Sequence, residues 1–262
     1  MQSNPQKNPQ LSKRQREILE MVAQQGFVAT EQLVECFGVT PQTIRRDINL
    51  LCDENLLQRF HGGASSPTNT ENEPYPERRR ASHAGKKKIG ELVAKHIPNG
   101  ASLFINIGTT TEAVSEALLS KENLSVVTNN LNVARILSAN PTFEIMISGG
   151  KLRARDGGIV GQTAADFVSQ FRLDYGIIGV SGIEQDGSLL DFDARETEIS
   201  RLIMQYSERL LLVADHSKFG RRAMVRFGSI DEVDDLYTDV ALAEPYLTTL
   251  SNGNVNVHIA ED

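Results

Sequence analysis

The segment TPQTIRRDINLL, residues 40–51, combines a helical repeat with side chains that can contact nucleic acid. Ile44, Ile48 and Leu51 recur at helical spacing and predict one buried face. The polar residues fall off that face, near the start of the helix, where glutamine, threonine and arginine can reach base edges or phosphates. A surface helix with two incidental arginines is the alternative. The candidate DNA-contacting residues of this segment are Thr40, Pro41, Gln42, Thr43, Arg45 and Arg46.

The elements around this segment favour DNA binding. Helical patterns are expected over residues 13–25, 31–37 and 41–55. We expect Thr30 and Thr40 to cap the second and third helices, and Gly26 and Gly38 to end the first and second. Pro41 suits a first helical position, where its missing N–H does no harm. Two helices joined by a tight glycine turn are typical of a helix-turn-helix.

The next residues, LLQRFHGGA at 56–64, form a short extended pattern with a Gly-Gly turn, which predicts a β-hairpin or wing. Arg59 and His61 on this wing are further candidate DNA contacts. The stretch VATEQLVECFGVTPQTIRRD, residues 28–47, together with RFHGGA closely resembles the N-terminal domain of DeoR-type bacterial repressors. The resemblance implies a winged helix-turn-helix domain over residues 11–66 that binds operator DNA.

The charge distribution agrees with two separate tasks. Net charge is −7, but residues 1–90 hold 13 lysines and arginines against 10 acidic residues, and residues 91–262 hold 14 against 24. The sequence has no apolar run of the roughly 20 residues that cross a bilayer, and its start, MQSNPQKNPQ, has no apolar region typical of a signal peptide or anchor. We therefore expect a cytoplasmic protein, in which Cys36 and Cys52 are buried free thiols.

A linker is expected after the wing. The stretch SSPTNTENEPYPE, residues 65–77, is rich in proline and small polar residues, and we assign residues 67–79 to this linker. Two basic clusters, Arg78–Arg80 and Lys86–Lys88, are expected to begin a helix that ends near Pro98. We interpret them as the solvated face of a linker helix; contacts with DNA phosphates are the alternative.

From residue 80 to 262 the pattern predicts an α/β domain. Apolar runs alternate with helical patterns, which indicates a largely parallel sheet. The expected strands are 102–107, 125–128, 144–148, 175–180 and 209–214, and the expected helices include 112–119, 132–137 and 196–206.

Polar and glycine-rich segments follow several of these strands and predict a phosphate pocket. Gly108-Thr-Thr-Thr111 lies between a strand and a helix, where backbone N–H groups and hydroxyls can bind an anion. It lacks the Gly-Lys-Ser/Thr ending of a Walker A loop, so a nucleoside triphosphate is not expected. Ligands in open α/β sheets bind beyond the carboxyl ends of the strands. The candidate effector-binding residues are Gly108, Thr109, Thr110, Thr111, Thr128, Asn129, Asn130, Gly149, Gly150, Ser181, Gly182, Asp193, Glu196 and Lys218.

The resemblance to DeoR-type regulators extends over residues 11–239, through IGTTTEAV, VVTNNLNVA, RDGGIVG, FRLDYGIIGVSGI and ADHSKFGRRAMV. It implies an effector domain related in fold to ribose-5-phosphate isomerase. It also implies a sugar-phosphate or polyol-phosphate effector, in particular sn-glycerol 3-phosphate, control of glycerol-metabolism genes, and a homodimer or homotetramer.

Catalysis is the competing hypothesis, because an isomerase relative implies a possible base. Asp191, Asp193 and Glu196 could supply one, although such residues before a helix also serve as caps. The five histidines are scattered without the spacing of metal ligands. The expectation is therefore a repressor without enzymatic activity, cofactor or metal. A regulator of another sugar phosphate, or an isomerase with a DNA-binding module, is the alternative.

Overall fold

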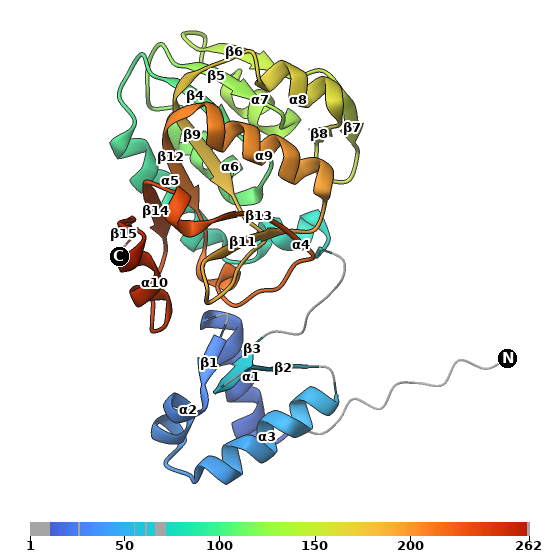
Figure 1. Ribbon diagram of the computed structural model, residues 1–262, viewed down its shortest axis with the longest axis vertical. Helices are drawn as coiled ribbons and strands as arrows, with labels where there is room; N and C mark the ends of the chain where they lie inside the picture. The colour runs from blue at the N-terminus through green and yellow to red at the C-terminus, as the bar shows by residue number, and fades with distance from the viewer. Residues whose placement is uncertain (1–10, 26, 55, 61, 66–71, 261–262) are drawn as a thin grey trace, which may run out of the picture. The chain divides into compact units, whose positions relative to one another are not determined.

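The computed structural model describes residues 11–25, 27–54, 56–60, 62–65 and 72–260, and the chain divides into two compact units, residues 1–68 and 69–262 (Figure 1). Each unit has its own hydrophobic core. Along the described parts of the chain, no helix is long and apolar enough to cross a membrane.

The first unit is a three-helix module with a small sheet. Its helices are α1 (Lys13–Gln25), α2 (Thr30–Phe37) and α3 (Pro41–Asp53). Its antiparallel sheet has the order β1 (Phe27–Ala29), β3 (Gly63–Ser65) and β2 (Gln58–Phe60). Ile18, Leu33, Ile44 and Leu51 are fully buried in its core. The expected buried face of α3 and the expected wing are confirmed.

The ends of α2 and α3 show which of the capping residues expected from the sequence cap a helix in the structure. The Thr40 side chain accepts a hydrogen bond from the Thr43 amide at 3.3 Å, and Gly38 has φ 61°, so both expected caps are confirmed. The expected cap at Thr30 is wrong: Thr30 is the first helical residue, and its N–H donates to the Gly62 carbonyl at 2.7 Å. Strand β1, which the sequence pattern did not predict, runs directly into α2, so the capping position falls on its last residue, Ala29, whose side chain makes no capping hydrogen bond. Gly26 lies outside the described residues.

The two cysteines are free, as expected, but their predicted burial is wrong. Cys36 is exposed on α2 and Cys52 is only half-buried on α3. Helix α3 ends at Asp53, slightly before the expected position.

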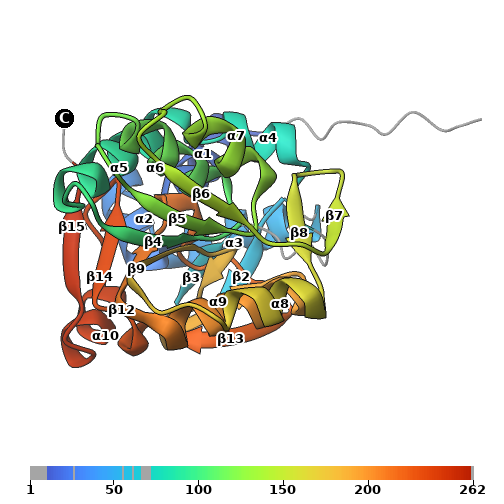
Figure 2. The same cartoon turned by 90° about the horizontal axis from the view of Figure 1, so that it is seen from above.

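The second unit is built on a seven-stranded, fully parallel sheet (Figure 2). Its strands, in spatial order, are β15 (Asn256–Ile259), β14 (Asp235–Thr238), β12 (Ser207–Val213), β9 (Leu173–Gly179), β4 (Ser102–Ile105), β5 (Ser125–Thr128) and β6 (Glu144–Ile147). The α/β class is confirmed, and the five expected strands are all present. The pattern did not predict β14 and β15, which complete one side of the sheet.

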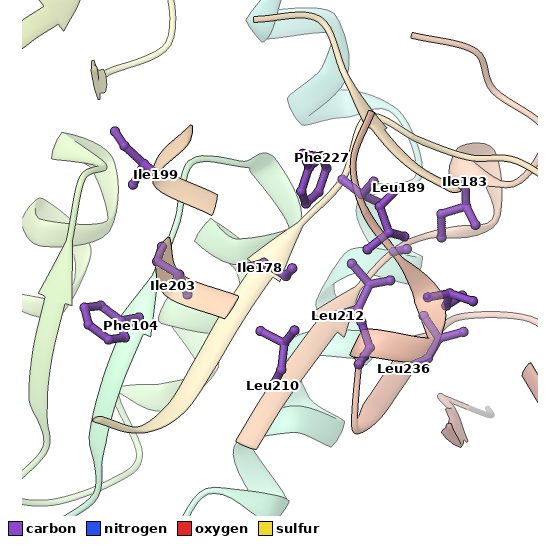
Figure 3. Packing of buried hydrophobic residues seen from close by; sticks show 14 of the residues in the cluster. Phe104, Ile178, Ile183, Leu189, Ile199, Ile203, Leu210, Leu212, Phe227 and Leu236 are labelled. Atoms are coloured by element: carbon purple, nitrogen blue, oxygen red, sulfur yellow. The ribbon is translucent and has the colours of Figure 1, made fainter. Parts of the chain in front are cut away.

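Helices cover both faces of this sheet, as Figure 2 shows. On one face lie α5 (His83–His96), α6 (Thr109–Leu118) and α7 (Leu131–Leu137), whose apolar side chains share a cluster with Leu103 and Ile177. On the other lie α8 (Gln162–Val168) and α9 (Ala194–Tyr206). There Ile199 and Ile203 of α9 pack with Phe104, Ile178 and Leu210 (Figure 3).

Short elements complete the second unit. A small sheet has the order β10 (Gly182–Ile183), β11 (Ser188–Asp191) and β13 (Val225–Ser229), and β7 (Lys151–Arg153) pairs with β8 (Gly158–Val160) as a hairpin. The remaining helices are α4 (Tyr75–Arg80), α10 (Tyr246–Asn252) and the 3-10 turns η1 (His216–Lys218) and η2 (Ile230–Glu232).

The predicted linker and the helix after it require correction. Residues 72–79, assigned to the linker, belong to the second unit and contain most of α4. The single helix expected up to Pro98 is two helices, because Ser82 has φ 51° between α4 and α5. Arg78 and Lys86 are not a solvated face: their side chains are 14% and 3% exposed, and both are ion-paired within this unit.

Candidate functional site

Helix α3 presents a polar face at its amino-terminal end. Gln42, Arg45 and Arg46 are exposed there, and Thr43, half-buried, shares a hydrogen bond with the Thr40 hydroxyl at 2.9 Å. Pro41 is also exposed and occupies the first turn. The arrangement leaves two arginines and an amide available for a polyanion, as the groove contact of a helix-turn-helix requires.

One acidic residue of α3, Asp47, is turned away from this face. Asp47 is 5% exposed and accepts hydrogen bonds from Arg14 Nε at 2.6 Å and Gln15 Nε2 at 3.1 Å. Both partners lie on α1, so the interaction fixes α3 against α1. It also removes a negative charge from the exposed surface, which favours contact with phosphates.

The wing supplies one more cation beside α3. Arg59 of β2 is exposed, and its Nη1 donates to Asn49 Oδ1 of α3 at 3.3 Å. Asn49 is exposed one helical turn after Arg45 and Arg46. Sequence reasoning overlooked Asn49, although its helical spacing is a usable signal. The candidate His61 lies outside the described residues.

In the second unit, an inner pocket of about 30 Å³ opens beyond the carboxyl ends of β4 and β9. This volume has room for about two water molecules. Six of the candidates predicted from the sequence line this pocket, together with further charged residues. Its lining consists of Arg78, Ile107, Gly108, Thr109, Thr110, Gly179, Val180, Ser181, Asp191, Glu196, Lys218 and Arg221.

The amino-terminus of α6 forms one wall of the inner pocket. Gly108 is the residue before the helix, and its carbonyl accepts the Glu112 N–H at 3.0 Å. The amides at the start of a helix have no acceptor within it, and the helix dipole favours an anion at this end. The Thr110 side chain makes no hydrogen bond within the described part of the chain, although the residue is only 4% exposed. These donors suit a phosphate.

Lys218 supplies a buried charge from the turn that follows β12. Its Nζ lies 3.9 Å from Asp215 Oδ2, and the Nζ of Lys86 lies 3.8 Å from the same oxygen. Burial lowers the pKa of Lys218, and it lowers the pKa of Lys86 to about 8. Burial disfavours the Asp215 carboxylate, but Lys218, Lys86 and the hydrogen bonds from Ser217 together hold its pKa below the usual value. One carboxylate therefore faces two ammonium groups.

Arg221 and Arg78 add two guanidinium groups to this lining. Arg221 donates to the Ser181 carbonyl at 3.2 Å and lies over the Phe192 ring at 5.2 Å. The acidic members are Asp191 and Glu196, both buried. Burial raises the pKa of both carboxyl groups. A state in which both are ionised is therefore disfavoured relative to one in which a carboxyl group is protonated and neutral. The inner pocket consequently carries an excess of positive charge.

An outer cavity of about 290 Å³ shares Arg78, Asp191 and Glu196 with the inner pocket. Arg153 organises it by donating to Asp156 at 2.8 and 2.9 Å, Asp193 at 3.0 Å and Glu196 at 2.6 Å. Asp193 also caps α9 by accepting the Arg195 N–H at 3.0 Å. This concentration of polar groups suits a ligand with hydroxyls.

Seven candidates lie outside the lining of both cavities. The Thr111 hydroxyl donates to the carbonyls of Asn106 and Gly108, and the Thr128 hydroxyl donates to the Ile105 carbonyl. The Asn129 side chain donates a hydrogen bond to the Ile159 carbonyl, and the Asn130 side chain caps α7. The remaining three are glycines: Gly149 and Gly150 precede β7, and Gly182 packs so closely on the Arg221 carbonyl that a Cβ would not fit. Of the fourteen candidates, the cavities bring together Gly108, Thr109, Thr110, Ser181, Asp193, Glu196 and Lys218.

Sequence reasoning missed the arginines of the site. Arg78, Arg153 and Arg221 reach the cavities from three separate segments. Arg153 lies three residues before Asp156, with which it forms an ion pair, and Arg221 follows the Lys218 turn. Their proximity to recognised motifs is the signal that could have found them. Arg78 offered none, because it stands in a run of three arginines.

The comparisons with known families agree with both units. Residues 14–70 match the DeoR-like helix-turn-helix domain, and residues 81–240 match the DeoR C terminal sensor domain. The chain belongs to the DeoR family.

Several relatives of this DeoR-family chain are named as repressors. It is 50% identical over 248 residues to the glycerol-3-phosphate regulon repressor of Escherichia coli, covering 95% of this chain and 98% of that protein. It is 52% identical over 227 residues to the repressor of the same name from Haemophilus influenzae, covering 87% and 89%. It is 38% identical over 249 residues to the repressor CsqR of E. coli, covering 95% of each. The chain is therefore a DNA-binding transcriptional repressor, as the sequence predicted.

Solved structures share parts of the fold at low similarity. The match to ribose 5-phosphate isomerase A from Neisseria gonorrhoeae has a TM-score of 0.37 and 18% identity over 52% of this chain and 53% of that one. The match to eIF2B delta from Chaetomium thermophilum has a TM-score of 0.41 and 10% identity, covering 68% and 55%. These likenesses are too distant to bear on activity.

Proposed function

We propose that this repressor controls genes of glycerol metabolism in the cytoplasm and is released from its operator by sn-glycerol 3-phosphate. The effector assignment is supported by two relatives at 50% and 52% identity that are named for glycerol 3-phosphate. The observation that carries it in this chain is the meeting of Lys218, Arg78 and Arg221 at the start of α6. A phosphorylated ligand matches this excess of buried positive charge.

The effector is proposed to bind with its two ends in different surroundings. The phosphate occupies the inner pocket, where it accepts hydrogen bonds from the first amides of α6, the Thr110 hydroxyl and Lys218. The glycerol hydroxyls face the outer cavity, where Asp193 and Glu196 can accept from them.

The operator is proposed to be read by the amino-terminal turns of α3. Gln42, Arg45 and Arg46 contact base edges, while Thr40, Thr43 and Arg59 bind the phosphate backbone. Helix-turn-helix proteins usually act as symmetric oligomers on paired half-sites, so we propose a homodimer or homotetramer.

A calorimetric titration of the full chain tests the effector. We expect saturable binding of sn-glycerol 3-phosphate, and no measurable binding of glycerol or of inorganic phosphate at the same concentration. Ribose 5-phosphate and fructose 6-phosphate serve as comparisons, because the outer cavity of about 290 Å³ leaves room for a longer sugar phosphate. Tighter binding of either would assign this chain to another sugar phosphate.

A further inference from the structure

The segment of residues 72–80, named the strap here, lies against the effector cavities. In the chain it comes shortly after the DNA-binding unit, which ends at residue 68. Asn72 accepts from Arg221 Nη2 at 3.0 Å, and Tyr75 donates to Glu112 Oε2 at 2.7 Å. Glu112 stands in the first turn of α6, the helix whose amino-terminus forms a wall of the inner pocket. The strap is thus held by groups of the effector site.

Arg78 is the residue of the strap that enters the site most deeply. It lines both the inner pocket and the outer cavity, and its side chain is 14% exposed, whereas the neighbouring Arg79 and Arg80 are exposed. Its Nε donates to the Glu73 carbonyl at 3.1 Å, and its Nη2 lies 3.3 Å from Asp156. A guanidinium has five N–H donors, and two of those of Arg78 have an acceptor within the described residues.

A second connection runs through Lys86 to the backbone of the strap. The buried Lys86 ammonium donates to the carbonyls of Arg78 and Ala81, at 2.5 and 2.6 Å, while it shares Asp215 with Lys218. The Arg78 carbonyl also accepts from the Thr109 hydroxyl at 3.4 Å. Two ion pairs, Lys218 with Asp215 and Asp215 with Lys86, therefore connect Lys218 to the carboxyl end of α4.

We infer that Arg78 binds the phosphoryl group of the effector directly, and that the strap transmits effector binding to the DNA-binding unit. This inference rests on the proposed function. A dianion between Lys218 and Arg78 offers Arg78 a closer counter-charge than Asp156, at 3.3 Å, and offers Lys218 a closer one than Asp215, at 3.9 Å. Effector binding then fixes the position of the strap, which is covalently continuous with the DNA-binding unit.

The test separates effector affinity from coupling in the full-length chain. Coupling is measured as the ratio of operator dissociation constants with and without saturating sn-glycerol 3-phosphate, typically about 5- to 150-fold in allosteric proteins. We expect Arg78→Met to weaken effector binding on the order of 10- to 100-fold. At effector concentrations that saturate the variant, its ratio should also fall towards one. Arg79→Met removes the same charge from the exposed neighbour and should keep the parental affinity and ratio.

Thr110→Val provides the second comparison, because Thr110 lines the pocket but lies outside the strap. It should weaken effector binding and yet retain the parental ratio at saturation. A full parental ratio in Arg78→Met, or parental effector affinity in that variant, overturns the inference. If the parent itself neither binds the effector nor responds to it, the proposed function fails, and this inference fails with it.

Hydrogen exchange of the unmodified chain tests the same point without a substitution. Amides of residues 75–82 should exchange at least severalfold more slowly when sn-glycerol 3-phosphate is bound. Unchanged exchange in this segment, in a chain that binds the effector, contradicts the proposed role of the strap even if Arg78→Met does not fold.

Discussion

Lys86 and Lys218 share a single carboxylate oxygen, Oδ2 of Asp215, at 3.8 and 3.9 Å. Both distances exceed that of a hydrogen bond, and this oxygen has no hydrogen-bond partner within the described residues. The site therefore holds two buried ammonium groups that one carboxylate neutralises incompletely. The phosphate of the proposed effector would add the negative charge that this cluster lacks.

The first prediction concerns the charge of Lys218. Lys218→Met keeps most of the stem but removes the ammonium group, and loss of a charge-assisted hydrogen bond costs about 1.5–3 kcal/mol. Effector affinity should fall roughly 10- to 150-fold, while the operator is still bound, so the variant should repress even when the effector is present. Calorimetry gives the affinity. Effector binding as tight as in the parent would place the phosphate elsewhere.

The second prediction concerns pH and the buried carboxyl of Glu196. Burial, and then the neighbouring Asp191, raise the pKa of Glu196 to about 8, although Arg153 opposes the shift. Between the ordinary pKa of 4.5 and this value, the folded chain keeps a proton that the unfolded chain has released. The stability contribution of Glu196 therefore falls as pH rises from about 4.5 to about 8.

Glu196→Gln is neutral at every pH and should remove this decline. We expect the melting temperature of the variant to decrease less than that of the parent between pH 5 and pH 8. The comparison stops at pH 8 because Lys86, whose burial lowers its pKa to about 8, contributes in the opposite direction at higher pH. Parallel curves for the two proteins would show that Glu196 is ionised in the folded chain throughout.

The third prediction concerns the exposed arginines of α3. Alanine at Arg45 or Arg46 should weaken operator binding by about 1–3 kcal/mol where the side chain reads a base, with relaxed preference at one position of the site. An arginine that contacts only phosphate should instead weaken specific and non-specific DNA binding equally and lower the salt dependence. Fluorescence anisotropy at two salt concentrations distinguishes these outcomes. Parental affinity in both variants would remove α3 from the interface.

The fourth prediction separates stability from recognition on the same helix. Asp47→Ala leaves Arg14 and Gln15 without their acceptor and should destabilise the first unit by about 1–3 kcal/mol. Urea unfolding followed by circular dichroism measures this loss. Without urea and at low temperature, where the variant is folded, its operator affinity should stay close to the parental value. A loss of affinity without loss of stability would make Asp47 part of the DNA interface.

The sequence predicted the features that depend on local interactions. The Thr40 cap, the Gly38 turn and the buried face of α3 follow from neighbouring residues, and the five expected strands follow from apolar runs. The sequence pattern did not predict which distant segments pair as strands. Strand β1 exists because it pairs with β3, and β14 and β15 extend the sheet by pairing with each other and, through β14, with β12.

The candidate site shows the same division between local and distant effects. Gly108, Thr110 and Lys218 were predicted because each follows a strand, and parallel strands bring their carboxyl ends together. Arg78 and Lys86 were assigned to a solvated face because charged runs are usually exposed. Their burial depends on Asp156 and Asp215, which lie 78 and 129 positions further along the chain.

The affinity of the full chain for operator DNA, with and without saturating sn-glycerol 3-phosphate, tests the central claim most directly. Fluorescence anisotropy should show that the effector weakens binding by roughly 5- to 150-fold, the range of a coupling energy of about 1–3 kcal/mol. Reciprocity requires operator DNA to weaken effector binding by the same factor. An operator affinity that does not change at saturating effector would contradict the account.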